Sequence, residues 1–162
     1  MESFAGQDKA ESARCARAHL FGPFQLVAPD GTEIIISNRR ARALLAMLCL
    51  APDEPIDRDH LSKLLWPGRF EAQARASLRQ CLLDLGKLLA ASRCDLLQVS
   101  RSRISLNASA IQSDLNELEK TFAGGKWVQA TASILAIGGR HILEQLNFGE
   151  AFDGWLAERR QA

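Results

Sequence analysis

Basic, amide and hydroxyl side chains gather along one side of the stretch formed by residues 71–91. The stretch reads EAQARASLRQCLLDLGKLLAA, and its apolar residues return at helical spacing as Ala74, Leu78, Cys81, Leu82, Leu85, Leu88 and Leu89. This spacing predicts an amphipathic helix with one face in a core. The side chains outside that apolar stripe include Gln73, Arg75, Ser77, Arg79, Gln80 and Lys87. Arginine, glutamine and serine can reach base edges and phosphates from a helix in a DNA major groove. An ordinary solvated helix face is the alternative.

A second basic element follows that helix at residues 96–107, which read LLQVSRSRISLN. Apolar and polar residues alternate on both sides of a turn at residues 100–103, and this pattern predicts a β-hairpin. Arg101 and Arg103 would lie at its tip. Between Trp66 and Ser105 seven basic residues stand against three acidic ones, although the net charge of the whole chain is only +1. A local basic patch on a neutral chain is typical of a small DNA-binding module.

Two shorter helices would have to position these basic elements. Residues 39–50 are apolar nearly all round, which predicts a buried central helix whose N-cap is Ser37 or Asn38. Asp57 is expected to cap a second helix at residues 58–66. Three helices followed by a hairpin make a winged helix. The second and third helices are therefore predicted to form a helix-turn-helix, with the long third as recognition helix.

Further arginines flank this predicted unit. Arg39, Arg40 and Arg42 crowd the first turn of the central helix, where the helix dipole disfavours cations. They form either a solvated cluster or a set of phosphate contacts. Arg69 precedes the long helix directly. We therefore include Arg39, Arg40 and Arg69 among the candidate contacts to the DNA backbone.

Short runs rich in aromatic and β-branched residues precede the helices at residues 19–21, 24–27 and 32–37. Gly-Pro and Pro-Asp-Gly turns separate them, so three short antiparallel strands are predicted. Residues 1–17 mix small and charged types without periodicity, which predicts a disordered tail. The winged-helix domain is accordingly expected to span residues 18–110.

The last third of the chain is predicted to be helical. Asp114 can cap a helix at residues 115–122, with Glu117 completing a capping box. Two Gly-Gly pairs enclose a second helix at residues 127–137, and apolar residues near the end of the chain indicate a third. Residues 111–162 are therefore expected to form a partial all-α domain. The fold class predicted for the whole chain is α+β, a winged helix-turn-helix with N-terminal antiparallel strands, a hairpin wing and a small helical appendage.

Composition excludes several other classes of protein. The four cysteines are far apart and form no C-x-x-C motif, which favours free thiols in a reducing cytoplasm over disulfides or a zinc site. The longest apolar run, residues 43–51, is too short to span a bilayer, and the polar N-terminus shows no signal peptide. The three histidines lack metal-ligand spacing, and no G-x-S-x-G motif occurs. We therefore predict no enzymatic activity, no catalytic residue, no metal, no cofactor and no membrane contact.

Several ordered motifs resemble one family. The run HLFGPFQLVAPDGTEIIIS-NRRARALLAMLCLAP is similar to the first strands and helix of the SARP (antibiotic regulatory protein) branch of the OmpR/PhoB-type winged-helix regulators. The run IDRDHLSKLLWPGRFEAQARASLRQCLLDL resembles the helix-turn-helix segment of that branch, and EAFDGWLAERR resembles a signature of the bacterial transcriptional activation (BTAD) region that follows it. The likeness runs from about His19 to Arg160.

The resemblance implies a transcription regulator that binds double-stranded DNA. It places Arg75, Ser77, Arg79 and Gln80 on the recognition helix and Arg101 and Arg103 on the wing. It also implies that the Pro67–Phe70 loop can touch RNA polymerase and that two copies can bind direct repeats. The last 50 or so residues would be the start of a TPR-like (BTAD) helical domain. One departure is Gly86-Lys87, which stands where the family usually has an arginine.

A second reading of the sequence stays open. A winged helix that has lost DNA binding can serve as a protein-interaction module. The low net charge and the departure at Gly86-Lys87 favour this alternative, whereas the arginines on both the helix and the wing favour DNA binding.

Overall fold

The computed structural model describes residues 15–162 and has an α+β architecture of two small sheets and six helices in that part of the chain. In chain order the elements are β1 (Ala16–His19), β2 (Gln25–Val27), α2 (Arg39–Leu50), β3 (Ile56–Asp57), α3 (Arg58–Leu65), α4 (Glu71–Ala91), β4 (Leu97–Val99), β5 (Arg103–Leu106), η1 (Ala108–Ala110), β6 (Ile111–Ser113), α5 (Asp114–Ala123), α6 (Trp127–Ile137) and α7 (Glu150–Gln161). Most of the predicted tail, residues 1–14, lies outside the described residues. Strand β1 begins at Ala16, so the structured part starts earlier than the predicted residue 18.

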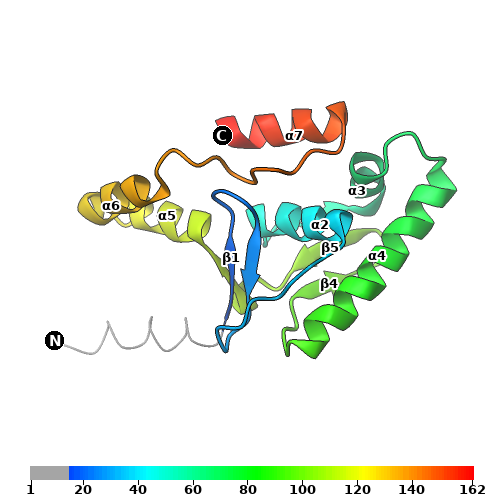
Figure 1. Ribbon diagram of the computed structural model, residues 1–162, viewed down its shortest axis with the longest axis horizontal. Helices are drawn as coiled ribbons and strands as arrows, with labels where there is room; N and C mark the ends of the chain where they lie inside the picture. The colour runs from blue at the N-terminus through cyan, green and yellow to red at the C-terminus, as the bar shows by residue number, and fades with distance from the viewer. Residues whose placement is uncertain (1–14) are drawn as a thin grey trace.

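Helix α2 is the centre of the core. Its residues from Ala43 to Cys49 are all at most 2% exposed. The Asn38 side chain accepts hydrogen bonds from the backbone N–H groups of Arg40 (2.9 Å) and Ala41 (3.2 Å), so Asn38 rather than Ser37 is the N-cap. Helices α3 and α4 and strand β5 pack around α2. Figure 1 shows α2 between the first sheet and the long helix α4.

The predicted hairpin forms the second sheet, with strand order β3-β5-β4. Strands β4 and β5 are antiparallel, and Ile104 and Leu106 point into the core. The short strand β3 pairs with β5 through Ile56 and Ile104. Because Asp57 ends β3 and also caps α3, the hairpin is joined directly to the start of that helix.

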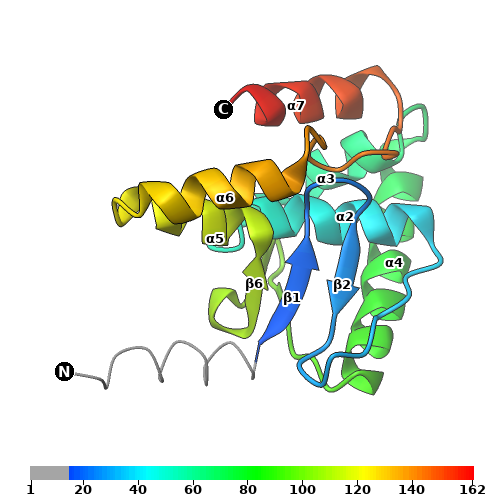
Figure 2. The ribbon, with the colours of Figure 1, turned by 60° about the vertical axis from the view of Figure 1, so that its left-hand side comes forward.

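The first sheet differs from the prediction. Its order is β2-β1-β6, with β1 antiparallel to β2 and parallel to β6. Figure 2 shows these three strands side by side in front of α2. The third N-terminal strand predicted at residues 32–37 does not form, since only one bridge, between Val27 and Glu33, continues the pairing. Ile34 and Ile36 are instead buried in the core as side chains of an irregular segment.

The C-terminal third is attached to the first sheet at two places. Ser113 caps α5, accepting from the Asn116 N–H, so the predicted capping role of Asp114 is wrong. The Asp114 carboxylate instead accepts the backbone N–H groups of Leu20 (2.9 Å) and Phe21 (3.3 Å). The pairing of β1 with β6 crosses the expected domain boundary at residue 110. The division of the chain into two independent domains stays a prediction.

Helix α7 returns to the winged helix and lies along its upper side in Figure 1, away from α6. Phe152 is fully buried, Leu156 is 2% exposed, and α7 contacts α3. Before α7, the chain follows the end of β1, where the Leu143 N–H donates to the Leu20 carbonyl at 2.7 Å. Helices α5 and α6 lie at the opposite end of the molecule from α4 in Figure 1.

Candidate nucleic-acid interface

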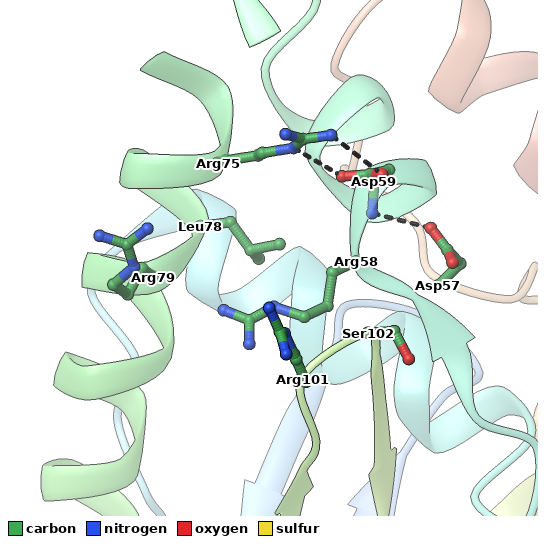
Figure 3. Close-up of a pocket in the computed structure, with 8 residues that line it drawn as sticks. All are labelled: Asp57, Arg58, Asp59, Arg75, Leu78, Arg79, Arg101 and Ser102. Atoms are coloured by element: carbon green, nitrogen blue, oxygen red, sulfur yellow. Dashed lines mark hydrogen bonds and ion pairs between the residues drawn. The ribbon is translucent and has the colours of Figure 1, made fainter. Parts of the chain in front are cut away.

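A cleft of about 490 Å³ lies between α3, α4 and the turn of the β4–β5 hairpin. Its lining residues are Asp57, Arg58, Asp59, Arg75, Leu78, Arg79, Arg101 and Ser102. Figure 3 shows that the arginines around this cleft come from three separate elements. Four arginines stand against two aspartates there, so the cleft is electropositive. The predicted recognition helix and the predicted wing thus meet at one basic surface.

Arg75 is held by carboxylates on both sides. Its Nε lies 2.8 Å from Asp59 Oδ1 and its Nη2 lies 3.2 Å from Asp59 Oδ2, while Nη2 also donates to Glu71. The hydrogen bond from Arg75 is the main reason that the pKa of Asp59 is lowered from its ordinary value of 3.8, and the same contact raises the pKa of Arg75. The pairing joins α3 to α4 and compensates most of the Arg75 charge.

Other predicted side chains of the helix also have intramolecular partners. The Arg69 Nη1 donates to the Ser77 hydroxyl at 2.9 Å, and the Gln80 amide donates to Asp84 at 2.9 Å. Gln73 and Lys87 are exposed on α4. All of these side chains remain at the surface except Ser77, which is half-buried.

Three of the predicted contact residues are cations without an acidic partner in a salt bridge within residues 15–162: Arg79, on α4, and Arg101 and Arg103, in the hairpin. All three are exposed. Arg79 and Arg101 line the same cleft. A free cation at such a place has its strongest available partner in an external anion.

Arg58 is a cleft residue that the sequence reasoning missed. Its Nη1 donates to the Ser100 carbonyl at 3.1 Å, and its backbone N–H donates to the Ser102 carbonyl at 2.9 Å. These bonds fasten the hairpin turn to the start of α3. The available signal was its position directly after the predicted cap Asp57, at the beginning of the helix-turn-helix.

Arg39 and Arg40 lie outside the cleft. Arg39 donates to Asn147 and lies 5.0 Å from the centre of the Phe148 ring, before α7. The Arg40 Nε donates to the Leu65 carbonyl at 2.8 Å, at the end of α3. Both side chains thus tie α2 to neighbouring segments, and neither lines the cleft. Their contact with the DNA backbone stays a prediction.

The remaining reactive groups are arranged for packing. Burial raises the pKa of the Cys49 thiol far above its ordinary value and that of Cys81 to about 11. Within residues 15–162 no group of three or more His, Cys, Asp or Glu side chains is placed to hold a metal ion. In the same part of the chain, no helix has both the length and the apolar character needed to cross a bilayer.

No protein-family model matches the sequence. Over 76 residues, however, the chain is 36% identical to the transcriptional regulatory protein EmbR of Mycobacterium bovis and of Mycobacterium tuberculosis. The matched part is 47% of this chain, and it spans only 19% of the length of these curated relatives.

The structural similarity to EmbR covers more of the chain than the sequence match does. A solved structure of Mycobacterium tuberculosis EmbR in complex with a low-affinity phosphopeptide superposes with a TM-score of 0.65 at 25% sequence identity. The superposition covers 88% of this chain and 41% of that one. The predicted resemblance to SARP-type winged-helix regulators is confirmed. In this fold α3 and α4 form the helix-turn-helix and the β4–β5 hairpin is the wing.

Proposed function

We propose that this chain is a DNA-binding transcriptional regulator that acts in the cytoplasm. Helix α4 enters the major groove, and the β4–β5 wing lies on the adjacent groove or the backbone. The observation that carries the proposal is the cleft between α4 and the wing, which is lined by arginines from three elements. The relatives are named as transcriptional regulators, which supports the same function.

The charge distribution supports double-stranded DNA as the partner. Phosphate attraction supplies most non-specific affinity, and it needs exposed cations that can neutralise phosphates and so release the counterions condensed on the DNA. Arg79, Arg101 and Arg103 meet that condition. Binding of this kind needs no catalytic residue, metal or cofactor.

The direct test is an electrophoretic mobility shift on genomic fragments from the native host, followed by footprinting of any retained fragment. We expect one or a few fragments to shift at a protein concentration that leaves competitor DNA unbound. Protection should cover a major groove and a neighbouring minor groove. Failure to retain any duplex, even at low salt, would rule the proposal out.

A winged-helix protein-interaction module is the second candidate. Arg75, Ser77 and Gln80, three of the expected helix contacts, already have partners within the chain. Phe70 is 81% exposed just before α4, which gives a protein partner an apolar anchor. This candidate predicts that replacing Phe70 abolishes function in the cell while replacing Arg79 and Arg101 has no effect.

We further propose that the Pro67–Phe70 loop contacts RNA polymerase when the regulator is on DNA. The loop belongs to the turn between α3 and α4, with Gly68 at a φ of 79° and Phe70 exposed. A Phe70→Ala protein should bind DNA normally and stimulate transcription less in a purified system. Reduced DNA binding by that variant would instead assign Phe70 to the DNA interface.

Binding of two copies to direct repeats is also proposed. Duplexes with one and with two copies of the footprinted sequence provide the test. We expect two copies to bind the duplex that carries two sites. The copy that binds last should bind more tightly than the copy that binds first. Independent binding of the two copies would argue against contact between them.

A further inference from the structure

Three arginines from three separate elements line the cleft, and none of them is tied to a carboxylate by a salt bridge within the described residues. They are Arg58 at the start of α3, Arg79 on α4 and Arg101 in the wing. Figure 3 shows the Arg58 and Arg101 side chains close together beside the hairpin turn, facing α4, while the Arg79 side chain lies along α4.

The two carboxylates of the cleft are occupied by other groups. Asp57 Oδ1 accepts the backbone N–H groups of Asp59 and His60 as the cap of α3. Asp59 is bound by Arg75 through both carboxylate oxygens. The cleft therefore keeps an excess of positive charge, contributed by the three arginines that have no such partner.

The place of the cleft in the fold indicates which anion it would take. A helix in the major groove and a hairpin in the adjacent minor groove must straddle the single sugar–phosphate strand that separates the two grooves. The cleft lies between those two elements. A phosphate of that strand would pass between Arg79 on one side and Arg101 on the other, with Arg58 at the base.

We propose that Arg58, Arg79 and Arg101 form a clamp for one backbone phosphate of the bound duplex. The proposal rests on the proposed DNA-binding function and adds Arg58 to the interface. Arg58 is positioned for this role, because its bonds to the Ser100 and Ser102 carbonyls hold the guanidinium against the wing. The same bonds set the distance of the wing from α3 and hence the width of the clamp.

The salt dependence of duplex binding tests the clamp. The logarithm of the binding constant falls with the logarithm of salt concentration, with a slope of about −0.9 for each phosphate neutralised. Affinity for a short mixed-sequence duplex would be measured over a salt series. The proteins are the wild type, each single variant (Arg58→Gln, Arg79→Gln, Arg101→Gln) and the triple variant.

Three arginines on one phosphate should act as a unit. The triple variant should lower the magnitude of the slope by about 0.9, and each single variant by less. A control with Lys120→Gln, Lys126→Gln and Arg159→Gln removes the same net charge from exposed sites on or next to α5, α6 and α7. It should keep the wild-type slope. Melting curves of all variants confirm that the proteins compared are folded.

Three results would overturn the clamp. A loss of about 2.7 in the triple variant means three separate phosphates. An unchanged slope in a triple variant that is folded removes the cleft from the interface while leaving DNA binding in place. No binding of the duplex by the wild type, even at low salt, overturns the proposed function and the clamp together.

Discussion

The Asp59 carboxylate on α3 accepts two hydrogen bonds from the Arg75 guanidinium on α4, at 2.8 Å and 3.2 Å. This fork-to-fork pair spans the two helices of the helix-turn-helix and fixes their relative rotation at the surface. It also means that the first arginine of the recognition helix is a structural residue in the free protein. The next arginine along the same face, Arg79, is left to meet DNA.

Asp59→Asn should change how stability depends on pH. The pKa of Asp59 is lowered from 3.8 in the folded protein, chiefly by the hydrogen bond from Arg75. Its charge therefore stabilises the fold above pH 3.8, and that contribution is lost as pH falls through the lower folded-state pKa. Urea unfolding at neutral pH and at pH values below 3.8 should show a flatter acid decline for Asp59→Asn. A decline as steep as that of the wild type would show that the pair does not stabilise the fold.

Replacing both Arg101 and Arg103 with alanine should weaken binding about equally on all duplex sequences. Both side chains are exposed in the wing and contribute attraction to phosphates rather than base readout. The magnitude of the salt slope should fall by about 1 for the loss of Arg103 and by less for the loss of Arg101, which shares its phosphate with Arg58 and Arg79. Thermal stability should not change, because neither side chain is packed. An unaltered salt slope would take the wing out of the interface.

Arg79 is a member of the clamp, so Arg79→Ala should reduce affinity for the footprinted site and for scrambled DNA alike, with little loss of thermal stability. The side chain is exposed and has no acid at i−4 or i+4, where Arg75 and Leu83 stand. A bidentate guanine contact is worth about 1–3 kcal/mol of discrimination, whereas a phosphate contact lowers affinity for all sequences alike. Binding to the footprinted sequence and to scrambled DNA separates these roles. If Arg79→Ala bound the site as tightly as the wild type does, the result would favour the protein-interaction module over the DNA-binding regulator.

Gln80→Ala should alter base preference more than overall affinity. The Gln80 amide is exposed on the outer face of α4 and is held only by Asp84, one turn along the same helix. Base preference can be read by selecting duplexes from a randomised pool with each protein. An identical preference for wild type and Gln80→Ala would show that this amide does not read a base.

Phe152→Ala should destabilise the protein by about 3–5 kcal/mol, the usual cost for a fully buried aromatic ring. Phe152 is 0% exposed and packs edge-on against Phe148 with ring centres 5.1 Å apart. Trp155, half-buried against Phe152, should also lower the melting temperature when changed to alanine, but by less. Trp127→Ala is the control, since that ring is 65% exposed. An unchanged melting temperature for Trp155→Ala would contradict its packing role.

The helices near the candidate interface could be predicted from the sequence alone. The limits of α4, Glu71 and Ala91, are those of the stretch predicted to be helical. The caps of α2 and α3 and the basic hairpin follow from equally local patterns. Such features depend on the backbone hydrogen bonds and side chains of neighbouring residues, so a short window of sequence contains the information that determines them.

The tertiary structure decided which side chains are free to act. The sequence already places Glu71 one turn before Arg75, but only folding brings Asp59 beside Arg75 as well, and Arg79 gains no such partner. Folding also brings Arg39 to Asn147, more than a hundred residues away in the sequence, and pairs β6 with β1. Asp114 likewise has the sequence of a cap but accepts hydrogen bonds from a distant strand end. Partners of this kind are set by how the elements pack around α2, and no local pattern encodes that packing.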